Sequence, residues 1–275
     1  MAKKFENQEN NGSLTIVTGA CGGLGSAFCA ELAKAGESLV ITGTNEDRLK
    51  QKKEELENLN KNIKVFCFKM DLAEPEERVA FFDFLKKENL RPHRLINNAG
   101  FIAEGAMLEF SDEKVLKIIR VNCEGTIDLT QKFIKMFEDN IEILCVSSLG
   151  AFYPMPYMSV YSATKRMIEC QMVALREEVK PKNIKVCTLC PGGIPTTKEM
   201  IDAIKAQGLG GKLSSQSPEY IAKYALKKLS KNKAIIIPGA FNRMLHFLGK
   251  FAGETMIAKA VGKRWAKANT KRKVK

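Results

Sequence analysis

A tyrosine and a lysine lie four residues apart in the segment Tyr161-Ser162-Ala163-Thr164-Lys165. On a helix this spacing places the two side chains on one face, one turn apart. A phenol ionises with a pKa of about 10, and a neighbouring ammonium group favours the phenolate and lowers that pKa. The pair is therefore a candidate general acid–base at neutral pH. The same spacing also arises by chance on solvated helix faces, so the pair alone leaves both interpretations open.

A glycine-rich segment at residues 18–25, with the sequence Thr-Gly-Ala-Cys-Gly-Gly-Leu-Gly, is the second place where the sequence suggests chemistry. Glycines allow a tight turn and let the backbone approach a pyrophosphate, while the first amides of a following helix attract negative charge. A glycine-rich turn without a ligand is the alternative. Because the segment follows an apolar run and precedes a helical pattern, dinucleotide binding is the favoured interpretation.

Several polar residues follow other apolar runs, and each has a plain structural explanation as well. Asp71 would serve as a helix N-cap, the segment 97–100 (Asn-Asn-Ala-Gly) as a turn, and Ser148 as another cap. The chain has two histidines. His93 follows a proline in a predicted surface loop, so the sequence does not support a serine nucleophile activated by histidine.

Short apolar runs alternate with helical patterns along most of the chain. The expected strands span residues 14–18, 38–42, 63–68, 95–97, 141–146, 184–189 and 234–237, and the expected helices span about 25–36, 45–59, 74–89, 111–138 and 157–179. Uninterrupted apolar strands are typical of a parallel sheet covered on both faces, so the pattern predicts a single doubly wound α/β domain. A ligand would bind at the carboxyl ends of the strands, where the strand order reverses.

The composition is that of a globular protein, with 45% hydrophobic and 27% charged residues among 275. No stretch of about 20 apolar residues is present, so no membrane-spanning helix is predicted. The polar segment 1–13 lacks the apolar core of a signal peptide, which predicts a cytoplasmic protein whose eight cysteines are reduced. No metal site is predicted.

The C-terminal segment is strongly basic, unlike the rest of the chain. Residues 231–275 contain 12 Lys or Arg and one acidic residue, for a net charge of +11, and residues 1–230 sum to +2. Apolar residues recur with helical spacing at Met244, Leu245, Leu248, Phe251, Ala252, Met256, Ile257, Ala260 and Val261. With Trp265 near the end, this pattern is typical of an amphipathic helix at a membrane surface. A helix that packs on residues 196–217 or on a second subunit is the alternative.

Taken together, these motifs resemble those of the classical short-chain dehydrogenase/reductase family. The matching residues occur in the order and spacing of that family: Thr18, Gly19, Gly23, Gly25, Asp71, Asn97, Asn98, Ala99, Gly100, Asn122, Ser148, Tyr161, Lys165, Pro191 and Gly192. The resemblance implies one Rossmann-type sheet of about seven strands in a catalytic domain at residues 13–238. A polar tail at 1–12 precedes this domain, a lid is expected at about 196–217, and a basic helical extension follows at 239–275.

The resemblance also implies roles for four catalytic residues. Tyr161 would protonate the substrate oxygen during carbonyl reduction, and Lys165 would lower the pKa of Tyr161 and hydrogen-bond the nicotinamide ribose. Ser148 would hold and polarise the carbonyl oxygen. Asn122, within the helix expected at 111–138, would hold a water that links Lys165 to solvent.

The cofactor-binding residues that the resemblance implies come from six segments of the chain. They are Thr18, Gly19, Gly23, Leu24, Gly25, Thr44, Asn45, Arg48, Asp71, Leu72, Asn98, Ala99, Gly100, Tyr161, Lys165, Pro191, Gly192, Ile194 and Thr196. Asp71 would contact the adenine, and Asn98 would help to fix the cofactor and the central sheet. Pro191 and Gly192 would lie near the nicotinamide.

The residues after the second strand favour NADPH over NADH as the cofactor. An acid there would bind the ribose hydroxyls and repel a 2′-phosphate, but the first acid is Glu46. Thr44 and Asn45 offer donors at a helix start, and Arg48 lies one turn further on. NADPH-preferring relatives often place an arginine near Thr44 or in the glycine loop, and this chain has neither.

The expected activity is that of an NADPH-dependent carbonyl reductase or alcohol dehydrogenase. Phe101 and the stretch 152–158 (Phe-Tyr-Pro-Met-Pro-Tyr-Met) suggest an apolar substrate such as a 3-oxoacyl compound, a sterol or another lipid-like ketone, unless these residues pack in the core or between subunits. The alternative is a catalytically silent nucleotide-binding regulator or a lipid-binding protein at a membrane surface. A homodimer or homotetramer through helices 111–138 and 157–179 is expected, with membrane-surface contact through the tail and no specific nucleic acid.

Overall fold

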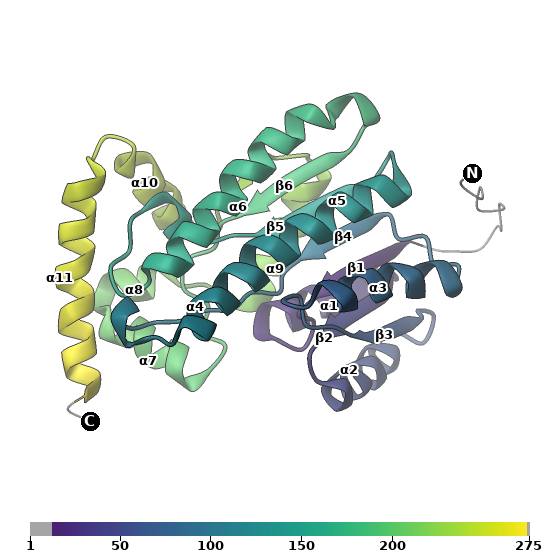
Figure 1. Ribbon diagram of the computed structural model, residues 1–275, viewed down its shortest axis with the longest axis horizontal. Helices are drawn as coiled ribbons and strands as arrows, with labels where there is room; N and C mark the ends of the chain where they lie inside the picture. The colour runs from purple at the N-terminus through teal and green to yellow at the C-terminus, as the bar shows by residue number, and fades with distance from the viewer. Residues whose placement is uncertain (1–12, 274–275) are drawn as a thin grey trace.

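Seven parallel strands form one sheet in the order β3-β2-β1-β4-β5-β6-β7 (Figure 1). This computed structural model describes residues 13–273; the tail predicted at 1–12 lies outside them. The strands are β1 (Leu14–Thr18), β2 (Ser38–Gly43), β3 (Val65–Lys69), β4 (Arg94–Asn97), β5 (Glu142–Val146), β6 (Lys185–Leu189) and β7 (Ile235–Ile236). The doubly wound sheet is thereby confirmed, and its strand order reverses between β1 and β4.

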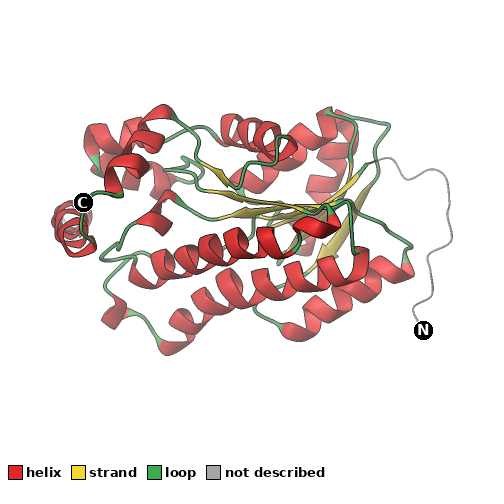
Figure 2. Cartoon of the chain, turned by 90° about the horizontal axis from the view of Figure 1, so that it is seen from above, coloured by secondary structure: helices red, strands yellow, loops and turns green. Residues whose placement is uncertain are grey.

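Helices cover both faces of the sheet (Figure 2). One face packs against α1 (Gly23–Lys34), α2 (Glu46–Leu59) and α9 (Pro218–Ser230), and the other against α3 (Pro75–Lys87), α5 (Thr126–Phe137) and α6 (Ser159–Glu178). Each interface is a continuous apolar core, with Phe28 and Ile41 in the first and Phe81 and Phe133 in the second. Burial on both faces explains why the strands are apolar without alternation.

The helix expected at 111–138 is divided in the structure. A helix α4 (Asp112–Ile119) leads into a π-helical turn (Arg120–Gly125) and then into α5. A Cβ atom on Gly125 would lie 2.6 Å from the carbonyl oxygen of Leu72, so only glycine allows this close approach of two backbones. A glycine within a helical pattern does not by itself predict such a turn.

Four further helices gather beyond the carboxyl ends of β4 to β7 (Figure 1). The segment predicted as a lid contains α7 (Lys198–Ala206) and α8 (Gly208–Ser214), joined at Gly208 with a φ of +65°. The C-terminal extension forms α10 (Ala240–Gly249) and α11 (Glu254–Lys273), which pack on α8 and α7 respectively. No helix within residues 13–273 combines the length and apolarity needed to cross a bilayer.

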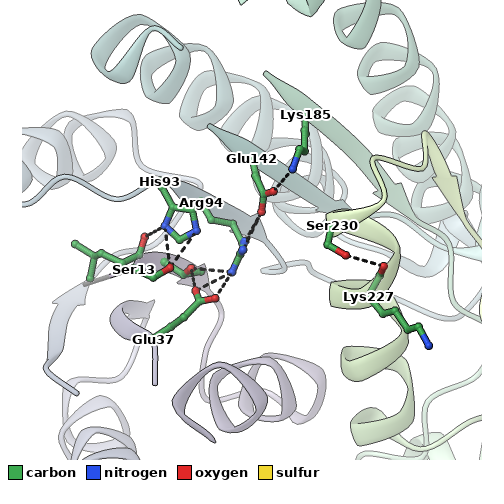
Figure 3. Close-up of polar contacts among 10 residues, drawn as sticks. Ser13, Glu37, His93, Arg94, Glu142, Lys185, Lys227 and Ser230 are labelled. Carbon is green, nitrogen blue, oxygen red and sulfur yellow. Dashed lines mark hydrogen bonds and ion pairs between the residues drawn. The ribbon is translucent and has the colours of Figure 1, made fainter. Parts of the chain in front are cut away.

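A cluster of ion pairs joins the opposite, amino-terminal edge of the sheet (Figure 3). Arg94 at the start of β4 contacts Glu37 before β2 at 2.7 Å and Glu142 of β5 at 2.8 Å, and Lys185 of β6 also contacts Glu142 at 2.8 Å. His93 lies beside this cluster, with its Nδ1 atom 3.0 Å from the carbonyl oxygen of Leu14 at the start of β1 (Figure 3). The cluster therefore joins neighbouring strands at the amino-terminal edge of the sheet, and the candidate catalytic residues lie at the carboxyl-terminal edge.

Candidate active site

A pocket of about 550 Å³ lies at the carboxyl edge of the sheet, where the strand order reverses. Its walls bring together Ser148, Tyr161 and Lys165 with every predicted cofactor-binding residue except Thr18. The remaining predicted residues in the walls are Gly19, Gly23, Leu24, Gly25, Thr44, Asn45, Arg48, Asp71, Leu72, Asn98, Ala99, Gly100, Pro191, Gly192, Ile194 and Thr196. Asn122 and Thr18 lie behind the walls, so both act on the pocket through other residues.

Thr18 is fully buried and joins β1 to β4 beneath the pocket. Its hydroxyl oxygen accepts hydrogen bonds from the backbone amides of Asn98 and Ala99, both at 3.0 Å. The Asn98 amide group donates in turn to the backbone oxygen of Thr18 at 2.9 Å and to that of Gly19 at 3.2 Å. Asn98 therefore fixes the glycine loop to the central sheet.

The glycines of this loop allow close contacts within the protein that side chains would prevent. Cβ atoms on Gly23 and Gly25 would lie 2.1 Å from Thr196 and 2.2 Å from the backbone oxygen of Gly19, so neither position accepts a larger residue without movement. The loop leads directly into α1, whose first amide groups lack partners within the helix. This cradle suits the pyrophosphate of a dinucleotide.

Arg48 lies where β2 ends and α2 begins. Asn45 caps α2 by accepting from the Arg48 amide at 2.9 Å, and the Arg48 guanidinium donates to the backbone oxygen of Cys21 at 2.8 Å. This bond holds the arginine across the mouth of the glycine loop. The pocket wall thus contains a cation at the place where sequence analysis found no acid.

Asp71 pairs with Lys117 of α4, whose ammonium lies 3.3 Å from the carboxylate. The other carboxylate oxygen accepts from the Ala73 amide at 2.9 Å. Glu74, rather than Asp71, occupies the N-cap position of α3, so the capping explanation of Asp71 is wrong. Lys117 lines the pocket, and sequence analysis missed it because a lysine on a helix carries no specific signal.

Tyr161 is 8% exposed at the start of α6. Burial raises the pKa of Tyr161 to about 12, because the phenolate loses its hydration, and a hydrogen bond with Ser148 opposes this change. The net change in the pKa of Tyr161 is therefore upward, and the expected net lowering is wrong. At neutral pH the side chain is a phenol and can donate a proton.

Lys165 is also buried, and burial lowers its pKa to about 8. Its ammonium donates to the backbone oxygen of Val146 at 2.8 Å and lies 5.8 Å from the centre of the Tyr161 ring. A Cβ atom on Gly100 would approach this ammonium to 3.2 Å. The lysine is thus held in the pocket by the end of β5 and leaves little space around Gly100.

Asn122 lies in the π-helical turn and binds protein groups with both ends of its amide. Its oxygen accepts from the Phe101 amide at 2.7 Å, and its nitrogen donates to the Phe101 carbonyl at 3.0 Å and the Thr164 hydroxyl at 3.1 Å. Asn122 therefore fixes the loop after β4 to α6, at the residue before Lys165.

The aromatic stretch at 152–158 does not line the cofactor pocket. Residues 152–156 of this stretch line a separate cavity of about 370 Å³, whose other side is formed partly by α11. Tyr153 packs against Gly249, where a Cβ atom would lie 2.5 Å from its ring. The structure therefore places residues 152–156 in a cavity of their own, outside the pocket that contains Ser148, Tyr161 and Lys165.

Cys187 and Cys190 have the Cys-x-x-Cys spacing of a redox motif. Both thiols are buried at the end of β6, and burial raises the pKa of Cys187 to about 11 and that of Cys190 further. Thiols that stay protonated are poor nucleophiles. The pair belongs to the core.

The short chain dehydrogenase family matches residues 13–207, which is most of the chain. The chain belongs to this family. It is an oxidoreductase that uses a nicotinamide dinucleotide, and the pocket at the carboxyl edge is the place where the family resemblance puts that cofactor.

Relatives with several activities are similar to this protein. It is 30% identical over 183 residues to a very-long-chain 3-oxoacyl-CoA reductase of Pyricularia oryzae, a match that covers 64% of this chain and 54% of that protein. It is 30% identical over 193 residues to an (S)-acetoin-forming diacetyl reductase of Staphylococcus epidermidis, covering 69% and 73%.

Solved structures share the fold at low sequence identity. A structure from work on 7beta-hydroxysteroid dehydrogenase stereoselectivity superposes with a TM-score of 0.82 at 22% identity, covering 91% of this chain and 97% of that one. A short-chain dehydrogenase from Sphingobium yanoikuyae in complex with NADPH has a TM-score of 0.74 at 23% identity, covering 87% and 93%.

Proposed function

We propose that this protein is an NADPH-dependent carbonyl reductase that acts on an apolar ketone, with Ser148, Tyr161 and Lys165 as its catalytic residues. The observation that carries the proposal is that these three side chains line one pocket with the glycine loop. Asn122 is a positioning residue, since its amide donates to the Phe101 carbonyl and the Thr164 hydroxyl and accepts from the Phe101 amide. The alternative of a silent nucleotide-binding protein does not explain why the complete set meets in one place.

The pocket residues account for proton transfer in such a reaction. A bound nicotinamide supplies or accepts hydride. Tyr161 is protonated at neutral pH and gives its proton to the substrate oxygen as negative charge develops there. Ser148 donates a hydrogen bond to the same oxygen and stabilises that charge. Lys165, cationic below about pH 8, stabilises the phenolate that Tyr161 leaves behind.

The preference for NADPH is supported by Arg48 and its surroundings. The 2′-phosphate of NADPH carries negative charge, and the pocket wall after β2 offers Thr44, Asn45 and Arg48. The guanidinium uses one N–H group to donate a hydrogen bond to the Cys21 carbonyl and has other N–H groups that could donate to a phosphate. Glu46, the first acid after β2, instead forms an exposed pair with Lys50 at 2.8 Å.

The apolar substrate is supported by the walls of the pocket rather than by the stretch 152–156. Phe101, Ile102, Ile194 and Met200 line it on the loops after β4 and β6 and at the start of α7. Ile102 is 46% exposed, so an apolar surface continues to the rim. A ketone with a hydrocarbon substituent would bury this surface.

The test is oxidation of NADPH, and separately NADH, with ketones from small diketones to 3-oxoacyl thioesters and steroids. We expect turnover with NADPH and an apolar ketone, and none with Tyr161→Phe. The Arg48→Ala variant should raise the KM for NADPH by at least about tenfold and leave that for NADH little changed. Tight NADPH binding without any turnover would instead favour the silent regulator.

A further inference from the structure

The outward face of α10 and of the turn that follows it is apolar. Phe247 is 60% exposed and Phe251 77% exposed, and their rings contact each other edge to face with centroids 5.3 Å apart. Met244 and Leu248 lie beside them on the same helix face, each about half exposed. The opposite face packs on the body through Leu245 and the buried Asn242.

The start of α11 continues this exposed surface with a mixture of apolar and basic residues. Met256, 62% exposed, shares a helix face with Lys259, Ala260 and Lys263, all exposed. The inner face carries Ala258, Gly262 and Trp265. Trp265 is buried, so its expected role as a membrane anchor is wrong; Gly262 lets α11 approach Pro156 closely enough to bury that face.

Positive charge surrounds the apolar face. Arg243, Lys250, Lys259 and Lys263 are exposed on the same two helices. Residues 231–275 contain a single acid, Glu254. A surface with apolar residues at its centre and cations at its rim is complementary to anionic lipid head groups above a hydrocarbon layer.

We propose that the surface formed by Met244, Phe247, Leu248, Phe251 and Met256 docks on the face of a bilayer that contains anionic lipid. This inference goes beyond the proposed catalytic function and does not depend on it. The neighbouring helix α8, which contacts α10, exposes Leu209, Lys212 and Leu213, a smaller surface of the same character. Docking therefore brings the lid segment to the lipid surface as well.

The test is flotation of the full chain with vesicles of phosphatidylcholine alone or with one third phosphatidylglycerol. We expect binding to the anionic vesicles, weakened by salt, and at least about tenfold weaker binding of the double variant Phe247→Ser, Phe251→Ser. The matched control replaces two exposed apolar residues on the other side of the molecule, Leu59→Ser with Val79→Ser, and should bind like the wild type. The double variant Lys250→Glu, Lys259→Glu should lose the preference for anionic lipid.

Two further measurements distinguish docking of this surface on a bilayer from detachment of α11 and from contact with a second subunit. Trp265 is the single tryptophan of the chain and faces the body, so brominated lipids should leave its fluorescence unchanged when the protein binds. Strong quenching would show that α11 detaches and would overturn docking through the packed helices. Light scattering tests a third outcome. If the wild type does not bind vesicles, and the double variant Phe247→Ser, Phe251→Ser has a lower mass in solution than the wild type, the surface is a subunit interface and the proposal is refuted. Equal flotation of that variant and the wild type would also refute the proposal.

Discussion

Burial pushes Tyr161 and Lys165 toward their neutral forms, one by a raised pKa and the other by a lowered pKa. Tyr161→Phe removes the proton donor and little else, so turnover should fall by about 10²- to 10⁴-fold. Cofactor affinity, measured by quenching of protein fluorescence, should stay within about twofold. A variant that kept most of its turnover would show that another group supplies the proton.

Lys165 should make the folded protein less stable at neutral pH, because a buried ammonium group is poorly hydrated. Its folded pKa of about 8 lies below the ordinary value of 10.5, so this group's contribution to stability is present above pH 10.5 and is lost as pH falls through 8. The variant Lys165→Met, which should be inactive, should therefore have a higher unfolding free energy than the wild type at pH 7. The expected gain in urea denaturation is up to about 3 kcal/mol. The difference should shrink between about pH 8 and 10.5, and a constant difference would contradict this explanation.

At the scale of elements, the π-helical turn is the feature that places Asn122 between the loop after β4 and α6. Gly125→Ala should cost about 1–3 kcal/mol of unfolding free energy, since its Cβ would meet the Leu72 backbone at 2.6 Å. Gly253→Ala is the control, because a Cβ there has no neighbour within 4 Å. Equal effects in thermal denaturation would mean that the backbone relaxes freely at Gly125.

The strands, the glycine loop and the catalytic segments could be predicted because apolar runs and motif spacing are local features of the sequence. The π-helical turn could not, since its register depends on contacts of Asn122 with Phe101 and Thr164 from distant segments. Helix α9 was missed although Ser217 and Pro218 mark its start. The pKa of Tyr161 was misjudged because burial has no signature in the spacing of two residues.

At the scale of the molecule, the ion pairs of Arg94 join three strands at the edge opposite the pocket. Burial tends to raise the pKa of Glu142, but Lys185 and Arg94 outweigh it and lower that pKa, so its contribution to stability is present above its ordinary value of 4.5 and is lost at lower pH. Arg94→Met leaves Glu37 without its cation and Glu142 with Lys185 alone, and should cost about 3 kcal/mol at pH 7. The control variant Lys87→Met, at an exposed position, should lose far less unfolding free energy in the same denaturation experiment. Equal losses for the two variants would mean that the ion-pair cluster adds nothing to stability.

Self-association should use the exposed apolar residues of α4 and α6. Leu116 and Ile119 on α4 and Met167 on α6 are each about half exposed, and the two helices are in contact. We expect Met167→Lys to shift a homodimer toward monomer in light scattering at micromolar concentration. An unchanged mass would place the subunit contact elsewhere.

Of the eight cysteines, all within the described residues, Cys170 is the exposed one, and it lies on α6 one turn after Met167. A maleimide dye should therefore react first at this thiol, with no engineered substitution. Because the label sits within the expected subunit contact, its reaction rate should rise as the protein is diluted. The unaltered chain thus carries its own chemical reporter of assembly, at a position away from the groups that transfer protons.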